Sequence, residues 1–108
     1  MNYEFAARTS SLATETMKSV EVGGHQLLLA NLDGRFYAVA RKCTHFGGNL
    51  CNGKLVDGIV TCHKHGARFD LRTGRAVGQA TMLIFHKLPK DLRSYPVKIE
   101  GDQVLIGI

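Results

Sequence analysis

The chain begins with short runs in which apolar and polar residues alternate, separated by polar or glycine-containing turns. A two-residue period is typical of half-buried strands, and Asp33-Gly34 is the strongest hairpin signal among the turns. Residues 10–15 are instead expected to form one helical turn, capped by Ser10 or Ser11. The strands expected in this half are residues 3–7, 17–22, 25–32 and 35–40.

Two glycine-containing segments, residues 41–52 and 62–66, show no periodicity and each follow an expected strand. Such segments are candidates for functional loops. Residues 78–92 contain an apolar run that is too short to assign by its period. The strands expected in this half are residues 54–57, 59–61, 68–71, 75–77, 95–100 and 104–108. The pattern as a whole predicts an all-β protein of short antiparallel strands.

Composition agrees with a small β protein. The 108 residues suit a single domain spanning 1–108, and 12 glycines with 2 prolines fit a fold rich in tight turns. The net charge of +5 is scattered, with no basic run longer than Arg41-Lys42, so we expect no nucleic-acid partner. The sequence shows neither a signal-peptide pattern nor a membrane-length apolar run, so we expect a cytoplasmic protein without a membrane partner.

Cysteine and histidine gather in the two loops. The first loop reads C-T-H and supplies Cys43 and His45, whereas the second reads C-H-K-H and supplies Cys62 and His65. If the loops face each other, both cysteines can bind one iron of a [2Fe–2S] cluster and both histidines the other. Two alternatives stay open. Zinc also accepts two cysteines and two histidines, although zinc modules usually pair like residues at short spacing, and His63 could replace His65.

These loop sequences resemble those of Rieske ferredoxins. The resemblance rests on C-T-H-F-G-G from Cys43 and on C-H-K-H-G-A-R-F-D-L-R-T-G from Cys62, and it covers about residues 17–108. It implies a Rieske-like fold of stacked small antiparallel sheets, with a cluster-binding subdomain of two loops at about residues 41–72. It also implies that one Rieske-type [2Fe–2S] cluster is bound by Cys43, His45, Cys62 and His65.

Other residues near the loops differ from the pattern of the resembled family. His63 stands where the family commonly has proline, and it is expected to line the loop without binding iron. Cys51, the third cysteine, is expected to be a half-buried free thiol. In the membrane-complex branch of the family a disulfide joins the loops, but the matching positions here are Gly48 and Lys64. The segment 75–94 looks longer than usual, and the sequence assigns it no role.

The resemblance implies a one-electron carrier and not an enzyme. A free-standing oxygenase needs a second, mononuclear iron site within a catalytic domain, and this chain has no length to spare for one. A carrier of this kind takes electrons from a flavin reductase and passes them to an oxygenase or a reductase. The alternative is a fixed Rieske subunit of a multi-subunit reductase, such as a nitrite reductase.

The charge around the loops predicts a redox partner with an acidic docking face. Neither residues 41–48 nor residues 62–69 contain an Asp or a Glu, and opposite charge on a partner speeds encounter. The basic residues that flank the loops are Arg41, Lys42, Lys64 and Arg68.

The resemblance also bears on the reduction potential. Members of the resembled family that have a high reduction potential share a serine and a tyrosine, and the hydroxyls of both donate hydrogen bonds to the cluster sulfurs. This chain has Ala67 and Phe69 at the matching positions, and neither side chain can donate. We therefore expect a potential of about −150 mV, at the bottom of the Rieske range.

Overall fold

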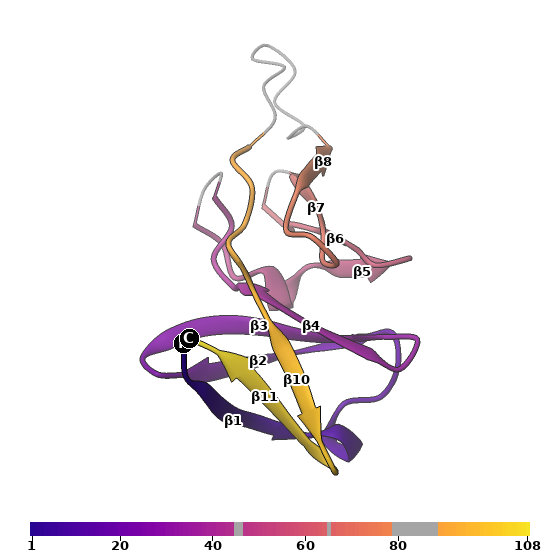
Figure 1. Cartoon of the computed structure of the whole chain (residues 1–108). Coiled ribbons are helices and arrows are strands. Elements are labelled where there is room, and N and C mark those ends of the chain that lie inside the picture. The colour runs from indigo at the N-terminus through magenta and orange to yellow at the C-terminus, as the bar shows by residue number, and fades with distance from the viewer. Residues whose placement is uncertain (45–46, 65, 79–88) are drawn as a thin grey trace.

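The structure is a computed structural model that describes residues 1–44, 47–64, 66–78 and 89–108. The strands of these residues form three antiparallel sheets (Figure 1). The central sheet has the order β2 (Thr16–Val22), β3 (His25–Leu32), β4 (Arg35–Ala40) and β9 (Ser94–Tyr95). The predicted all-β class of small antiparallel sheets is confirmed.

The other two sheets pack on opposite faces of the central sheet. One has the order β1 (Tyr3–Arg8), β11 (Gln103–Gly107) and β10 (Val97–Glu100). The other has the order β5 (Lys54–Val56), β6 (Ile59–Thr61), β7 (Arg68–Asp70) and β8 (Ala76–Gly78), and it lies at one end of the molecule (Figure 1). The molecule measures 48 × 26 × 18 Å, so this third sheet and its loops occupy one end of a long axis.

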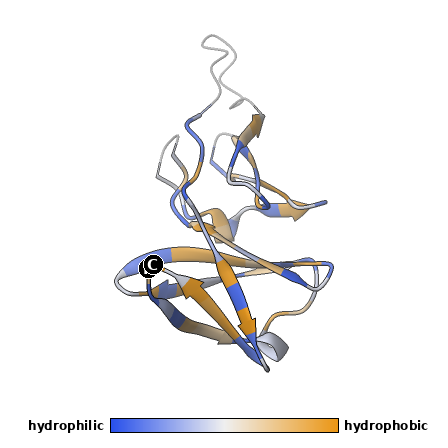
Figure 2. Ribbon diagram, viewed as in Figure 1, coloured by the Kyte–Doolittle hydropathy of each residue, from blue (hydrophilic) through white to orange (hydrophobic). Residues whose placement is uncertain are grey.

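Strand β3 contributes to two hydrophobic cores, because successive side chains of a strand point to opposite faces. Leu27 and Leu29 pack with Val104 and Ile106 in the core beneath the sheet of β1, β11 and β10. Leu28 belongs to the other core, which includes side chains of the third sheet. Burial on both faces explains why this strand reads as a nearly continuous apolar run (Figure 2).

Asn31 is the exception in that run, and its side chain is 8% exposed. Its amide nitrogen donates to the Leu12 carbonyl at 2.9 Å, and its amide oxygen accepts from the Gly34 N–H at 2.9 Å. A buried amide is tolerated when it is hydrogen-bonded. Asn31 therefore ties the hairpin turn after β3 to the segment that leads into β2.

The predicted strand at residues 95–100 is divided at Pro96. Strand β9 pairs with β4 in the register Ala38↔Tyr95, whereas β10 pairs with β11 in the register Val97↔Ile106. Proline has no N–H to donate to a sheet ladder, so Pro96 marks the point where the chain passes from one sheet to the next. The prediction of a single strand was therefore wrong.

The helical turn also differs from its prediction. It is a 3-10 turn, η1 (Thr9–Ser11), that follows Arg8 and has no side-chain cap. The Ser11 hydroxyl donates to the Arg8 carbonyl at 2.7 Å, so it closes the turn from within and does not accept from an N–H. The Thr9 N–H donates to the Asp102 carbonyl at 2.7 Å, which fixes the turn against the β10–β11 hairpin.

Candidate metal centre

The first cysteine lies in a loop that follows β4, here called loop 1 (residues 41–49). The base of loop 1 is closed by a bridge between Lys42 and Asn49, and the Leu50 N–H donates to the Arg41 carbonyl at 2.9 Å. A second 3-10 turn, η2 (Leu50–Asn52), follows. The Asn49 side chain caps this turn by accepting from the Cys51 N–H at 2.9 Å. Three residues are too few for a detectable period, so the sequence did not predict this turn.

The second cysteine lies in loop 2 (residues 62–67), which joins β6 to β7. It is closed by the same pair of backbone hydrogen bonds as loop 1. The N–H of each cysteine donates to the carbonyl five residues later, from Cys43 to Gly48 and from Cys62 to Ala67, both at 2.7 Å. The cysteine carbonyl accepts from the glycine four residues later, Gly47 at 2.9 Å and Gly66 at 3.1 Å. The two loops are therefore equivalent in backbone connectivity.

The glycine four residues after each cysteine is required by the backbone. Gly47 has φ +73° and Gly66 has φ +75°, a left-handed conformation that side chains other than glycine rarely adopt. Cysteine and glycine have this same spacing in both loops, a signal separate from the spacing of cysteine and histidine. It could have been found by aligning the two loops with each other, because C-T-H-F-G and C-H-K-H-G place glycine at the same distance.

The two loops touch at Gly48. An ideal Cβ on Gly48 would lie 3.4 Å from the Cys62 Sγ and 3.3 Å from the Lys64 Cδ. Gly48 is buried and its φ is not positive, so a close approach between the loops explains the absence of a side chain here. The expectation that the loops face each other agrees with this contact.

Both loop cysteines are buried in the same core. Cys43 and Cys62 are each 2% exposed, and they belong to a cluster that includes Leu50, Val60 and Phe69. Two buried thiols on loops of equivalent backbone connectivity form a donor set that suits an iron–sulfur cluster. The buried cysteines and the equivalent loops thus fit the expected cofactor.

The two predicted histidine ligands, His45 and His65, lie outside the described residues. Within the described ranges no three Cys, His, Asp or Glu side chains gather at one point. Thr44, next to Cys43, donates its hydroxyl to the Lys90 carbonyl at 2.6 Å. This bond fixes loop 1 to the described residues that precede β9.

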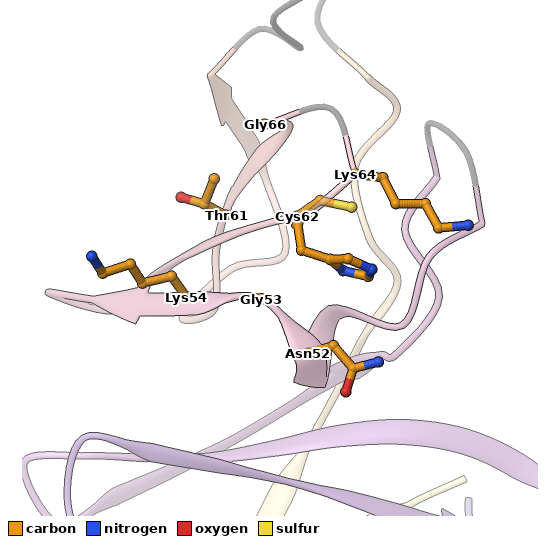
Figure 3. A pocket seen from close by; sticks show the side chains of 8 residues that line it. Asn52, Gly53, Lys54, Thr61, Cys62, Lys64 and Gly66 are labelled. Carbon is orange, nitrogen blue, oxygen red and sulfur yellow. The ribbon is translucent and has the colours of Figure 1, made fainter.

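A recess of about 550 Å³ opens beside loop 2, lined in part by Cys62, His63 and Lys64 (Figure 3). His63 is exposed there, as expected for a residue that lines the loop. Cys51 is a half-buried free thiol, as expected. Burial raises the pKa of the Cys51 thiol, and a Ser19 hydrogen bond and the Arg41 charge lower it by less.

A three-layer β fold with two equivalent cysteine loops at one end defines a small iron–sulfur protein of the all-β class. The chain belongs to the Rieske [2Fe-2S] domain family, whose model matches residues 2–96. The family binds one Rieske-type [2Fe–2S] cluster, which confirms the cofactor expected from the sequence. In the described residues no helix is both long and apolar enough to pass through a membrane.

Named relatives agree with this assignment. The ferredoxin component of biphenyl 2,3-dioxygenase from Rhodococcus jostii (strain RHA1) is 34% identical over 100 residues, which cover 93% of this chain and 87% of the relative. A ferredoxin component of naphthalene 1,2-dioxygenase/salicylate 5-hydroxylase systems from Ralstonia sp is 31% identical, covering 97% and 94%. The solved structure of a ferredoxin from Sphingomonas yanoikuyae B1 matches with a TM-score of 0.85, 27% identity and 99% coverage of both chains.

Proposed function

We propose that this protein carries single electrons to an oxygenase. The supporting observation is the pair of equivalent loops that bring the buried Cys43 and Cys62 into one core at the end of the molecule. The relatives that match nearly the whole chain are named ferredoxin components of dioxygenase systems, which are electron-transfer proteins and not catalytic subunits. These names favour a separate carrier over a fixed subunit of a nitrite reductase.

Four residues bind the cluster in this proposal. The thiolates of Cys43 and Cys62 bind one iron, and the neutral imidazoles of His45 and His65 bind the other. The bound cluster supplies the one-electron couple. Loops 1 and 2 hold the thiolates in place through their matching backbone hydrogen bonds, and the surrounding apolar core keeps water away from the buried sulfur atoms.

The electron donor in this proposal is a flavin reductase, and the partner surfaces that meet the loops are acidic. The charge distribution supports the docking part of the proposal. The described residues between 41 and 93 contain nine Lys or Arg against three Asp or Glu, whereas residues 1–40 and 94–108 contain four against six. The basic half holds the loops, so the charge separation follows the long axis of the molecule (Figure 1). An acidic partner would meet the loop end first.

Two further parts of the proposal concern the chain as a whole. We take residues 1–108 as a single domain, because both hydrophobic cores share the central sheet and neither closes without it. We place the carrier in the cytoplasm, where reducing conditions keep cysteine thiols available for iron.

The ligand assignment is tested by iron and sulfide analysis of anaerobically purified protein. The wild-type protein should contain two irons and two acid-labile sulfides per chain. Cys62→Ser and His65→Ala should each lose most of this iron, because a removed ligand leaves an iron incompletely coordinated. Cys51→Ser is the matched control and should retain full iron. Full iron in His65→Ala together with iron loss in His63→Ala would move the fourth ligand to His63.

A further inference from the structure

We propose that the methylene chain of Lys64 packs loop 2 against loop 1 and covers the Cys62 sulfur. This contact between the Lys64 stem and loop 1 is called the clasp below. This inference rests on the proposed role of Cys62 as a cluster ligand, and it assigns a positioning role to a side chain between two ligands. Lys64 itself contacts no iron in this proposal.

The geometry at Gly48 is the basis of the inference. The Lys64 Cδ and Cγ lie 3.3 and 3.5 Å from the position of an ideal Gly48 Cβ, and the Cys62 Sγ lies 3.4 Å from it. The lysine stem and the sulfur therefore approach the same point on loop 1 from loop 2. A side chain at position 48 would have to share this space with both.

Lys64 combines this packing with an exposed position. The residue as a whole is exposed, whereas Cys62 is 2% exposed. A lysine commonly lays its methylene stem on an apolar surface while its ammonium stays in water. In this arrangement the stem excludes water from the sulfur without the cost of burying a charge.

Lys42 is the natural comparison, since it has the same side chain in loop 1. Its Cε lies 3.0 Å from an ideal Cβ on Gly47, so it also packs over a glycine of a cysteine loop. Lys42 and Gly47 both belong to loop 1, however, so this contact does not join the two loops. Removal of Lys42 takes away an equal charge and leaves the clasp in place.

The test is the rate of iron release from the loaded protein to an excess of a ferrous chelator, followed by the chelator's absorbance under anaerobic reducing conditions. Lys64→Ala should release iron at least about fivefold faster than the wild type, because several packed methylenes are lost. Lys64→Met keeps an unbranched stem without the charge, and Lys42→Ala removes an equal charge together with a stem that packs only within loop 1. Both should stay within about twofold of the wild type.

A second variant pair separates the contact from a general loss of stability. Gly48→Ala introduces a methyl group where the Lys64 stem now lies, so alone it should speed iron release. In the double variant with Lys64→Ala the same methyl group enters vacated space, and iron release should be slower than in Lys64→Ala alone. If the two substitutions acted independently, their effects on the free energy of activation for iron release would add, and the double variant would release iron faster than either single variant.

Three results would overturn the clasp. They are an unchanged release rate in Lys64→Ala, release from Lys64→Met as fast as from Lys64→Ala, or equal acceleration in Lys42→Ala. The first shows that the contact does not affect cluster retention, the second that the Lys64 charge and not its stem is responsible, and the third that the effect is not specific to the contact between the two loops. Wild-type protein that contains neither iron nor sulfide would refute the proposed function itself. That result is distinct from the three above, which all require a wild-type protein that holds iron.

Discussion

Some residues at this site could be predicted from the sequence, and others could not. The two cysteines were predicted to be ligands from their spacing to histidine, because residue type and spacing are properties of the local sequence. The contact of Lys64 with Gly48 was not, because it depends on how two loops separated by the β5–β6 hairpin pack together. The potential and the thiol chemistry of the site can both be tested by single substitutions.

Two buried apolar residues set the expected low potential. Ala67 and Phe69 are both fully buried, and the Ala67 carbonyl accepts the hydrogen bond that closes loop 2. Ala67→Ser and Phe69→Tyr should each raise the midpoint potential by about 60 mV or more, because a charge-assisted hydrogen bond of ~1.5–3 kcal/mol would stabilise the added electron. Protein-film voltammetry measures the change.

Ala38→Ser is the control for these variants, because it adds a hydroxyl in the core on the opposite face of the central sheet. It should leave the potential unchanged. A wild-type midpoint above about +100 mV, in the upper part of the Rieske range, would contradict the account. So would hydroxyl variants that lower the potential.

Cys51 should show a shifted pH dependence. Because burial raises its pKa, the neutral thiol is favoured in the folded protein, and the reactive thiolate forms only at higher pH than in an exposed cysteine. Alkylation by iodoacetamide in the loaded protein should be slow at neutral pH. It should still accelerate at a pH where an exposed cysteine has reached its plateau. Mass spectrometry locates the label, and Cys51→Ser should take up none. A plateau at the pH of an exposed thiol would refute the shift.

At the scale of elements, the hairpins were predicted well because their turns are local. The strands β3 and β4 have the predicted bounds, with Asp33-Gly34 between them. The predicted strand at residues 95–100 failed because an alternating pattern does not show that its two halves pair in different sheets. The contacts of Lys90 with Thr44 in loop 1 and of Leu92 with Gly74 were also hidden, since they join segments far apart in the sequence.

Gly74 tests one of those distant contacts. It has φ +83°, and an ideal Cβ there would collide with the Leu92 carbonyl oxygen, while its own carbonyl accepts from the Leu92 N–H at 2.7 Å. Gly74→Ala should destabilise the protein by about 2–5 kcal/mol, the sum of a left-handed backbone and steric overlap. Urea unfolding of the loaded protein measures the change.

Gly34 provides the matched control for Gly74, because it has φ +85° and open space around its ideal Cβ. Gly34→Ala should lower the free energy of unfolding by about 1–2 kcal/mol, because only the left-handed backbone conformation is strained. Equal destabilisation by the two substitutions would mean that the close approach of Leu92 to Gly74 contributes nothing.

At the scale of the whole molecule, the two ends differ in charge. The loop end is strongly basic and the opposite end is slightly acidic, which would orient the carrier during its approach to an acidic partner. Composition alone gave a net charge of +5 with scattered basic residues. The separation became visible only once the fold had placed the cysteine loops and the sheet of β5 to β8 together at one end (Figure 1).

This separation predicts a salt-dependent rate of electron transfer. The second-order rate with the partner oxygenase should fall several-fold as ionic strength rises from about 10 to 500 mM, because salt screens the attraction. Arg68→Glu in the loop region should slow transfer at low salt. Lys18→Glu, at an exposed position of β2 in the central sheet, makes the same change of charge outside the loops and should have little effect. Stopped-flow absorbance follows the transfer, and a rate that is insensitive to salt would contradict acidic docking.

The central claim is that this chain is a carrier with a Rieske-type cluster bound by two cysteines and two histidines. The most direct test is an EPR spectrum of anaerobically purified protein before and after reduction with dithionite. The oxidised protein should give no signal, and the reduced protein should give a signal whose average g lies below that of all-cysteine ferredoxins, because histidine is the weaker donor. One zinc per chain without iron or acid-labile sulfide, or a reduced signal with the average g of an all-cysteine cluster, would contradict it.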